Sequence, residues 1–361
     1  MTQITIKQLA EICGVAVSTV SRAMNDRSDI NPETRRRILT AAADHGYVPN
    51  TSARSLKITS TNTIAVIIQG ETSPLLLQIL HLLEPALADH GYGLVLTHVA
   101  EGSAHAQVVS RIVTERKFDG VIFLGRYGDQ TGDHSRLGES LAQVGVPMVF
   151  CTTADFSGSA WQHSSVSVDD RIGSYELTRY LIELGHTRIA CVGNGLRGDG
   201  QHVWALRVAG YQQALVDAGI QPDPGLLLPA ALPSNIYSIT NGYESMRERM
   251  DRGPADFSAV VCICDAVAVG VMRALAESGV RVPEDCSVTG FDDLELARFV
   301  TPPLTTLAQP LEDIVSATAR AMVLALENPS AVPEQIWLRG RLVVRESTKA
   351  RAVPTSAPPT D

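Results

Sequence analysis

From residue 63 onward, short apolar runs rich in β-branched residues alternate with longer segments whose apolar residues recur at helical spacing. Such runs are typical of buried strands, and the longer segments have the length and period of helices. Repeated strand and helix units predict parallel sheets covered on both faces, and the number of units predicts two doubly wound lobes. The expected strands cover residues 63–68, 94–99, 120–125, 147–151, 188–193, 259–264 and 286–291, and the expected helices cover residues 75–90, 104–117, 136–144, 171–184, 205–218, 236–250 and 267–278.

The first 46 residues have a different pattern, which predicts three short helices. Thr5 and Gln8 have the spacing of a capping box, so the first helix begins directly after Thr5. A glycine turn separates it from a second helix over residues 17–24, and a third helix begins after Asn31 and ends at Gly46. Two short helices joined by such a turn form a helix-turn-helix, whose second helix enters the major groove of DNA.

The charge of the chain is unevenly distributed. The 361 residues carry a formal net charge of -9, and 45% of them are hydrophobic, as in ordinary globular proteins. Residues 1–60 hold eight Lys or Arg and five Asp or Glu, a net charge of +3, so the remainder carries -12. A weakly basic headpiece on an acidic body predicts modest DNA affinity for one headpiece and tight binding by two.

The six cysteines lie mostly within apolar runs, which favours reduced, buried thiols over disulfides. Cys262 and Cys264 share one face of an expected strand, but neither a second such pair nor a histidine at zinc spacing accompanies them, so we expect no metal. The first residues lack the pattern of a signal peptide, and no segment has the length and apolarity to cross a bilayer. We therefore expect a cytoplasmic protein that has no cofactor and does not bind membranes.

Four separated runs resemble the lactose repressor (LacI/GalR) family of bacterial transcription regulators. They are GVAVSTVSRAMN from residue 14, YVPNTSARSL from residue 47, GFDDLELARFVTPPLTTLAQP from residue 290 and RLVVREST from residue 341. The resemblance extends over about residues 4–348. One departure is Ala16, where the family usually has Ser, and it removes a hydroxyl that caps a helix and can contact a phosphate.

The resemblance implies an α/β fold with a helix-turn-helix headpiece and two periplasmic-binding-protein-like lobes of type I, between which the chain crosses three times. We expect the crossings near residues 157–165, 290–293 and 327–332. The expected domains are the headpiece at 1–46, a hinge helix and linker at 47–60, an effector-binding and dimerisation domain at 61–348 and a flexible tail at 349–361. Lobe 1 is expected at 61–160 and 293–326, and lobe 2 at 161–292 and 327–348.

The second helix of the headpiece is expected to read the major groove. Val17 can contact a thymine methyl and Ser18 several bases, while Arg22 can donate to O6 and N7 of guanine. A contact with phosphate alone is the simpler alternative for Arg22. Further polar residues expected to contact DNA, mainly its phosphates, are Thr5, Thr19, Ser21, Asn25 and Thr34.

The hinge begins with Asn50, which can cap a helix, but residues 50–57 are too few to form a stable helix alone. The resemblance implies that this helix pairs with its dimer mate in the minor groove, where Leu56 wedges between the central base pairs. Ala53 permits close approach, and Arg54 adds charge near the phosphates. Since wedging unstacks bases, a pyrimidine–purine step is expected at the operator centre. The alternative for Leu56 is an ordinary linker leucine that packs on the body.

Charged residues near strand ends are solvated by default, but two of them match ligand positions of the family. By resemblance, Arg207 binds ligand oxygens and Asp292 accepts from ligand hydroxyls, a pair suited to a carbohydrate. Cys264 stands where many members have Asn, and Leu75 and Leu76 stand where many have aromatic residues, so a nucleoside or another metabolite is the alternative effector. The effector-site residues implied by the resemblance are Gln69, Leu76, Thr152, Arg207, Tyr237, Cys264, Asp292 and Gln309.

These patterns favour a repressor that binds a near-palindromic double-stranded operator and is controlled by a small molecule, expected to be a sugar. A solute-binding protein would use the same body but would not explain the headpiece. A sugar-active enzyme is disfavoured because we find no glycine-rich phosphate loop, nucleophile elbow or metal triad, so no catalytic residue is expected. No heptads follow Arg345, so a homodimer is expected rather than a tetramer. Whether the effector releases the repressor or fastens it to DNA stays open.

Overall fold

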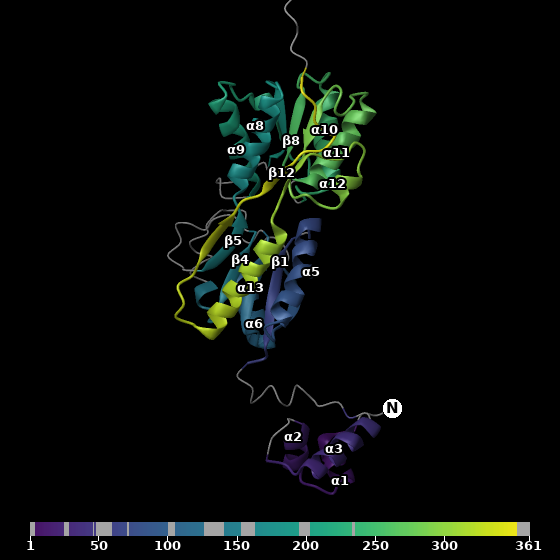
Figure 1. Cartoon of the computed structure of the whole chain (residues 1–361), viewed down its shortest axis with the longest axis vertical. Coiled ribbons are helices and arrows are strands. Elements are labelled where there is room, and N and C mark those ends of the chain that lie inside the picture. Colours follow the sequence, from purple (N-terminus) through teal and green to yellow (C-terminus); the bar gives the residue numbers. More distant parts are fainter. Residues whose placement is uncertain are drawn as a thin grey trace, which may run out of the picture. The chain divides into compact units, whose positions relative to one another are not determined.

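The computed structural model describes residues 4–24, 29–45, 47, 60–70, 72–99, 105–125, 141–152, 163–194, 203–232 and 235–351 (Figure 1). The chain divides into two compact units, Met1–Thr61 and Asn62–Asp361, called unit 1 and unit 2 below. The division falls one residue after the expected end of the linker.

Unit 1 contains three short helices, α1 (Ile6–Ile12), α2 (Val17–Met24) and α3 (Pro32–Asp44). Each helix contributes a fully buried side chain to a common core, namely Leu9, Val20 and Ile38. The three helices predicted from the sequence are therefore confirmed. The predicted helix stop at Gly46 lies outside the described residues.

Local side-chain contacts explain where these helices begin. Gln8 N donates to Thr5 Oγ1 at 3.3 Å and Thr5 N donates to Gln8 Oε1 at 2.8 Å, which is the predicted capping box. Gly14 has φ +60°, so the turn between α1 and α2 uses the left-handed region that glycine enters without steric cost. Asn31 caps α3, because its Oδ1 accepts from Glu33 N at 2.9 Å.

The larger sheet of unit 2 is six-stranded and parallel, in the order β11-β5-β4-β3-β1-β2. Alternate residues of one strand enter separate cores, since Ile64 and Val66 pack with α5 and α13 whereas Ala65 and Ile67 pack with α6. This burial on two faces is what an unbroken apolar strand predicts. The elements are β1 (Thr63–Gln69), α5 (Pro74–Ala88), β2 (Gly93–Val99), α6 (His105–Arg116), β3 (Gly120–Leu124), β4 (Met148–Cys151), β5 (Ser164–Val168), α13 (Leu311–Glu327) and β11 (Gln335–Leu338).

The smaller sheet is parallel as well, in the order β7-β6-β8-β9, and Figure 1 shows it in the other half of unit 2. Helix α8 packs against α9, and α10 packs against α11. The predicted α/β fold with two parallel-sheet lobes is confirmed. The elements are α8 (Asp170–Glu183), β6 (Ile189–Asn194), α9 (Val203–Asp217), the 3-10 helix η1 (Pro224–Leu226), β7 (Leu227–Pro229), α10 (Ile239–Asp251), β8 (Ala259–Cys262), α11 (Asp265–Glu277), β9 (Ser287–Thr289), α12 (Leu296–Phe299) and the separate antiparallel pair β10 (Thr306–Ala308) and β12 (Arg341–Val343).

Strand pairing corrects two of the expected lobe boundaries. Both β5 and β11 were expected in lobe 2, but they pair within the sheet of lobe 1. The chain therefore first leaves lobe 1 after Val168 rather than near 157–165, and leaves it finally after Leu338 rather than near 327–332. Three of the five residues of β5 are buried serines, so no apolar run marks this strand in the sequence.

The middle crossing also differs from the expectation at 290–293. Phe291 and Leu294 pack in the core of lobe 1, but Ala297 and Leu304 pack in the core of lobe 2. Helix α12 therefore belongs to lobe 2, and the chain passes to lobe 1 only after Leu304. The sequence does not reveal this excursion, because a short helix such as α12 has too few residues for a periodic pattern.

The remaining helices and the cysteines complete the comparison. The helix expected at 136–144 falls largely outside the described residues, and α13 was not expected. None of the described helices is both long enough and apolar enough to cross a membrane. All six cysteines are free and buried, as expected.

Candidate functional site

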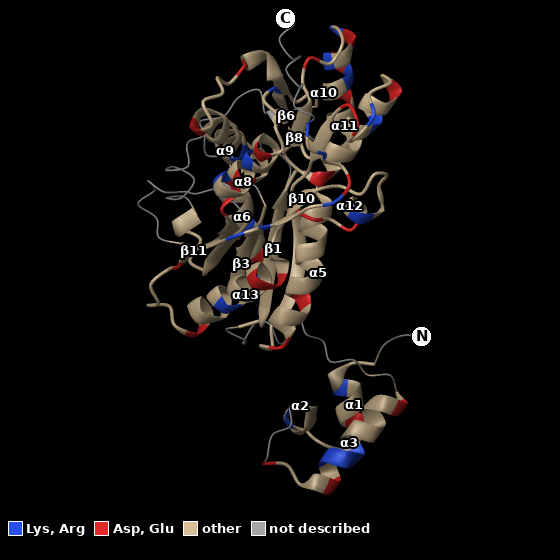
Figure 2. Cartoon of the chain, turned by 45° about the horizontal axis from the view of Figure 1, so that its top comes forward, with Lys and Arg blue, Asp and Glu red and all other residues tan. Residues whose placement is uncertain are grey.

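The side chains of α2 are divided between the core of unit 1 and an open face. Val20 and Ala23 are buried, as predicted, whereas Val17 is 41% exposed and Ser18 and Arg22 are also exposed. Figure 2 shows basic residues on each of the three helices of unit 1. The open face therefore presents polar and apolar groups of the kinds that can contact base edges and phosphates.

Arg22 makes only a weak ion pair within unit 1. Its Nη1 lies 3.4 Å from Asp29 Oδ2, and the two side chains are 61% and 58% exposed. An ion pair this exposed contributes about 0–1 kcal/mol to stability, so the guanidinium can turn to a base or a phosphate at little cost. Thr19, Ser21 and Thr34 are half-buried, and the Thr5 hydroxyl takes part in the capping box.

Helix α2 begins after Ala16, and weaker capping at this position stays a prediction. Thr19 N and Val20 N donate to the Ala16 carbonyl at 2.9 and 3.2 Å, but the methyl side chain has no acceptor for the backbone donors of the first turn. Five of the expected DNA contacts lie outside the described residues, namely Asn25, Asn50, Ala53, Arg54 and Leu56.

In unit 2, four polar side chains that are far apart in the sequence form one buried cluster. Arg207 donates from Nε to Asp170 Oδ1 at 2.7 Å, and its Nη1 lies 3.6 Å from Asp292 Oδ1. Gln309 donates from Nε2 to Asp292 Oδ1 at 2.7 Å. None of the four residues is more than 8% exposed. The structure thus brings together three of the predicted effector residues, Arg207, Asp292 and Gln309, and adds Asp170.

The cluster lies where the chain leaves its strands. Asp170 begins α8 directly after β5, and Asp292 follows β9, so both stand beyond the carboxyl ends of parallel strands, where α/β folds bind ligands. The guanidinium carbon of Arg207 lies 3.7 Å from the centre of the Phe291 ring, and Nη1 donates to the Ile263 carbonyl. These contacts hold the guanidinium in one orientation.

Burial and charge shift the pKa values of this cluster. Burial raises the pKa of Asp292 to about 6, against the opposing effects of Arg207 and Gln309. Burial also raises the pKa of Asp170, again against Arg207. Burial lowers the pKa of Arg207, but the attraction of Asp170 and Asp292 outweighs it, so this pKa is raised. The cluster therefore keeps its cation charged, while its carboxylates are costly to ionise.

Replacing Asp292 with Asn should change how stability depends on pH. Because the folded-state pKa of Asp292 lies above the reference value of 3.8, the native protein binds this proton more tightly than the unfolded chain. Wild type therefore loses stability as the pH rises from about 4 to about 6, and the Asn variant lacks this loss, which amounts to up to about 3 kcal/mol. Urea denaturation at pH 4.5 and 7.5 measures the free energy of unfolding of both proteins. If the difference between wild type and Asp292→Asn is the same at the two pH values, the prediction is wrong.

Backbone strain accompanies two residues that were expected to contact the effector. Asp292 has φ +118° and Thr152 has φ +56°, values that non-glycine residues seldom adopt. Thr152 follows β4, and its Oγ1 has no hydrogen-bond partner among the described residues although the atom is buried. Strained residues and unpaired polar atoms persist mainly where a ligand or a mechanism uses them.

The other expected effector residues are distributed over both lobes. Cys264 is buried beside the cluster, and its pKa is raised by burial and by the charge of Asp292. Its Sγ lies 3.7 Å from the Tyr237 carbonyl oxygen. Gln69 is the buried last residue of β1, and Leu76 lies in the first turn of α5. The structure therefore places Cys264 near the cluster and leaves the roles of Gln69 and Leu76 as predictions.

Sequence reasoning missed a second buried carboxylate next to the cluster. Asp265 begins α11, and its two oxygens accept from Thr306 Oγ1 at 2.5 Å and from Leu294 N at 2.7 Å. A Cβ at Gly290 would collide with this carboxylate, so only glycine fits there. In the sequence, Asp170 and Asp265 are marked only by their position at the start of a helix that follows a strand. Many ordinary helix caps have the same position, so this signal does not identify a site residue.

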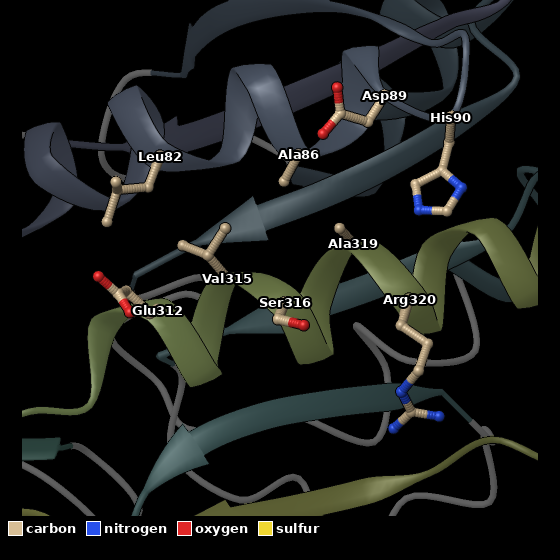
Figure 3. A pocket seen from close by; sticks show the side chains of 9 residues that line it. All are labelled: Leu82, Ala86, Asp89, His90, Glu312, Val315, Ser316, Ala319 and Arg320. Carbon is tan, nitrogen blue, oxygen red and sulfur yellow. The ribbon is translucent and has the colours of Figure 1, made fainter.

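A separate groove of about 660 Å³ lies between α5 and α13, and Figure 3 shows its lining. Leu82 and Ala86 of α5 face Val315 and Ala319 of α13, with charged residues such as Arg320 toward the ends. None of the residues that line this groove belongs to the Arg207 cluster. Within the described part of the chain, no group of three or more His, Cys, Asp and Glu residues is arranged to hold a metal ion.

Comparison with known protein sequences matches both parts of the chain. Residues 5–50 match the family model of bacterial regulatory proteins, lacI family, and residues 178–348 match that of a periplasmic binding protein-like domain. The HTH-type transcriptional regulator RegA of Clostridium saccharobutylicum is 30% identical over 95% of this chain and 99% of its own length. The HTH-type transcriptional regulator CelR of Thermobifida fusca is 31% identical over 95% of this chain and 98% of its own length.

Solved structures match the chain over nearly its whole length. The structure of the transcriptional regulator CelR in complex with cellobiose aligns with a TM-score of 0.69 at 30% identity, covering 96% of this chain and 100% of that one. The lac repressor dimer bound to operator and the anti-inducer ONPF aligns with a TM-score of 0.81 at 26% identity, covering 97% of this chain and 100% of that one. Both matches include the headpiece as well as the two lobes.

Proposed function

The chain belongs to the lacI family of bacterial regulatory proteins, and from this premise we propose how it acts. It is a DNA-binding transcriptional repressor whose two headpieces, one from each subunit of a homodimer, bind a near-palindromic operator. A carbohydrate effector binds to the polar cluster of unit 2 and changes the affinity for the operator. Because its target is bacterial DNA, its place of action is the cytoplasm.

One observation carries this proposal. A helix-turn-helix with an open recognition face and a two-lobed α/β body with a buried polar cluster are present in the same chain. A solute-binding protein needs only the second part, and an enzyme needs neither the recognition helix nor a headpiece. We assign no catalytic role to any residue. The relatives support both halves, since one solved structure contains cellobiose and another contains operator DNA.

The effector site is proposed to bind hydroxyl groups. Asp292 accepts hydrogen bonds and Gln309 can both donate and accept, while a sugar hydroxyl does both at once. The buried Thr152 Oγ1, which has no partner among the described residues, offers a further contact. Gln69, Leu76, Tyr237 and Cys264 complete the proposed site. Leu76 and Cys264 make part of it apolar, which suits the less polar face of a sugar or of a related metabolite.

Ligand binding would act on the segments that cross between the lobes. Asp170 follows the first crossing, and Asp292 precedes the middle one in a segment whose neighbours Phe291 and Leu294 pack on lobe 1. A ligand that contacts Arg207, the partner of Asp170, and Asp292 therefore acts close to two crossings. The segment after the last crossing is joined to the segment before the middle one, because Arg345 pairs with Asp293 at 2.5 Å. A hinged body of this kind switches only if the ligand binds one arrangement of the lobes more tightly than the other. To move the two arrangements from a population ratio of 1:99 to 99:1, the binding free energies must differ by about 5.5 kcal/mol.

The proposal is tested by separating its two activities. Operator selection from random duplexes with the intact chain should enrich a near-palindrome, and sugars should then be screened for thermal stabilisation and for a change in operator affinity. Asp292→Ala should abolish the response to sugar and leave operator binding in place. If the intact chain selects no duplex at low salt, the proposal is wrong. It is also wrong if Asp292→Ala loses operator binding and the sugar response to the same extent.

The proposed dimer surface includes α12. Phe299 is 78% exposed, and Leu77 of α5 is 53% exposed. In both Figure 1 and Figure 2, α12 lies on the same side of unit 2 as α5 and α11. We propose that α12 and α5 contribute to the dimer surface, because contacts between subunits would bury both exposed side chains. Phe299→Glu should therefore raise the dimer dissociation constant by about tenfold or more.

The matched control for Phe299→Glu is Val332→Glu. Val332 is 81% exposed but lies in the connection between α13 and β11. Sedimentation equilibrium of both variants measures the association. A dimer of unchanged strength in Phe299→Glu, or equal weakening in the two variants, contradicts the proposed surface.

A further inference from the structure

The hydrogen-bonding capacity of Arg207 is largely used within the protein. Its Nε donates to Asp170 and its Nη1 donates to the Ile263 carbonyl, while the Phe291 ring covers one face of the guanidinium. Two forks are available to an arginine that binds a carboxylate or a phosphate, one through Nε and Nη2 and one through the two Nη atoms. In each fork, one of the two donors is already engaged. Among the described residues Nη2 makes no hydrogen bond, so Nη2 is the nitrogen that a ligand can reach without displacing a contact made within the protein.

The charge of Arg207 is also fully compensated. Its Nε lies 2.7 Å from Asp170 Oδ1, and its Nη1 lies 3.6 Å from Asp292 Oδ1. The side chains of all three residues are 6% or less exposed. The group therefore has one more carboxylate than cations. Buried charges are screened far less than exposed ones, so an anion entering this site would meet net repulsion.

We infer that Asp170 sets the charge selectivity of the effector site, which accepts uncharged polyhydroxylated ligands and rejects those that carry a carboxylate or a phosphate. The inference rests on the proposed effector site and adds a residue that contacts Arg207. With Asp170 in place, the charge of Arg207 is neutralised and its Nε is occupied. Without the Asp170 charge, Arg207 and Asp292 balance each other, so the excess negative charge that repels an anion is removed.

The test compares matched ligands on two variants of the full chain. Ribose, glucose and cellobiose are the uncharged probes, and ribose 5-phosphate, glucuronate and glucose 6-phosphate are the anionic ones, with affinities from calorimetry. Asp170→Asn keeps an oxygen that accepts from Arg207 Nε but removes the charge. The control is Glu183→Gln on the same helix, an equal loss of charge at a side chain that is 62% exposed.

In the wild type, an uncharged sugar that binds should bind at least about tenfold more tightly than its anionic derivative. Asp170→Asn should reduce this ratio by about tenfold or more, and Glu183→Gln should leave it unchanged. A wild type that binds the anionic derivative as tightly as the parent sugar overturns the inference and leaves the proposed function intact, even if Asp170→Asn fails to fold. An unchanged ratio in folded Asp170→Asn also overturns it. Binding of none of the six probes would count against the sugar-binding site itself.

Discussion

Replacing Arg207 with Met should lower the free energy of unfolding of unit 2 by about 3–5 kcal/mol at pH 8, because it leaves buried carboxylates without their cation. Asp170 and Asp292 each lie within 3.6 Å of the guanidinium and have no comparable cation to replace it among their described ion pairs. Met fills a similar volume, so the decrease reports charge rather than a cavity. Thermal and urea unfolding of the full chain measure it.

The pH dependence of this decrease identifies its cause. Removal of Arg207 raises the folded-state pKa values of Asp170 and Asp292 further above their unfolded values, since it takes away the interaction that opposes burial. Groups with a raised folded pKa destabilise the protein as the pH rises through the interval between the two values. The deficit of Arg207→Met should therefore be largest at pH 8 and smaller at pH 5, where both carboxyls take up protons.

A matched control is Arg188→Met. Arg188 also contacts two carboxylates, Asp223 at 3.2 Å and Asp256 at 2.6 Å, but its side chain is 46% exposed. Solvent screens such pairs, so the variant should be destabilised by less than about 1 kcal/mol. Equal destabilisation of the two variants, or a deficit of Arg207→Met that does not change with pH, would contradict the role assigned to burial.

Arg22→Ala should weaken binding to the selected operator by tenfold to a hundredfold for each headpiece, the range expected when a base interaction of about 1–3 kcal/mol is removed. The effect in a dimer on a two-fold site is larger, because the substitution affects both half-sites. Specificity should relax at one base pair in each half-site. The headpiece itself should stay folded, since Arg22 is exposed and makes only a weak ion pair with Asp29.

The control for Arg22→Ala is Arg36→Ala, which removes the same charge from an exposed position on α3. Filter binding at several salt concentrations to the operator and to a scrambled duplex distinguishes base recognition from phosphate binding. Removing a base interaction changes the ratio between the duplexes, whereas removing a phosphate interaction lowers both affinities together and reduces the salt slope by about 1. A uniform decrease in Arg22→Ala would mean that this arginine touches only phosphate.

Both predictions concern charged groups, but their environments differ. Arg22 is exposed and only weakly paired, so it is available to a partner that brings its own negative charge. Arg207 is buried and compensated, so it serves to hold two carboxylates in position, and its Nη2 is left for a ligand. Ligand affinity at Arg207 therefore depends on how well the ligand replaces contacts made within the protein, while DNA affinity at Arg22 depends on salt.

Several elements could be predicted because their signals are local. The capping box of Thr5 and Gln8 and the cap at Asn31 involve residues at most three positions apart, and the structure confirms each. The apolar strands 63–69 and 259–262 are buried on both faces, so their composition alone marked them. The motif GFDD likewise indicated Asp292, since its residues stand together in the chain.

The parts that were missed depend on contacts between distant residues. Strand β5 is rich in serine, and its burial becomes possible because Ser165 and Gln335, 170 residues apart, hydrogen-bond to each other. The lobe boundaries followed from that pairing. Asp170 was missed for the same reason, because its partner Arg207 lies 37 residues away on another helix.

The sequence by itself determined the helix-turn-helix, the alternation of strands and helices and the two-lobed α/β fold, because periodicity, caps and turns act over a few residues. Only the tertiary structure decided which strands share a sheet, where the chain crosses between the lobes and which carboxylate neutralises Arg207. Those outcomes depend on which side chains meet after the chain has packed, and a buried charge is stable only beside the partners that packing brings to it.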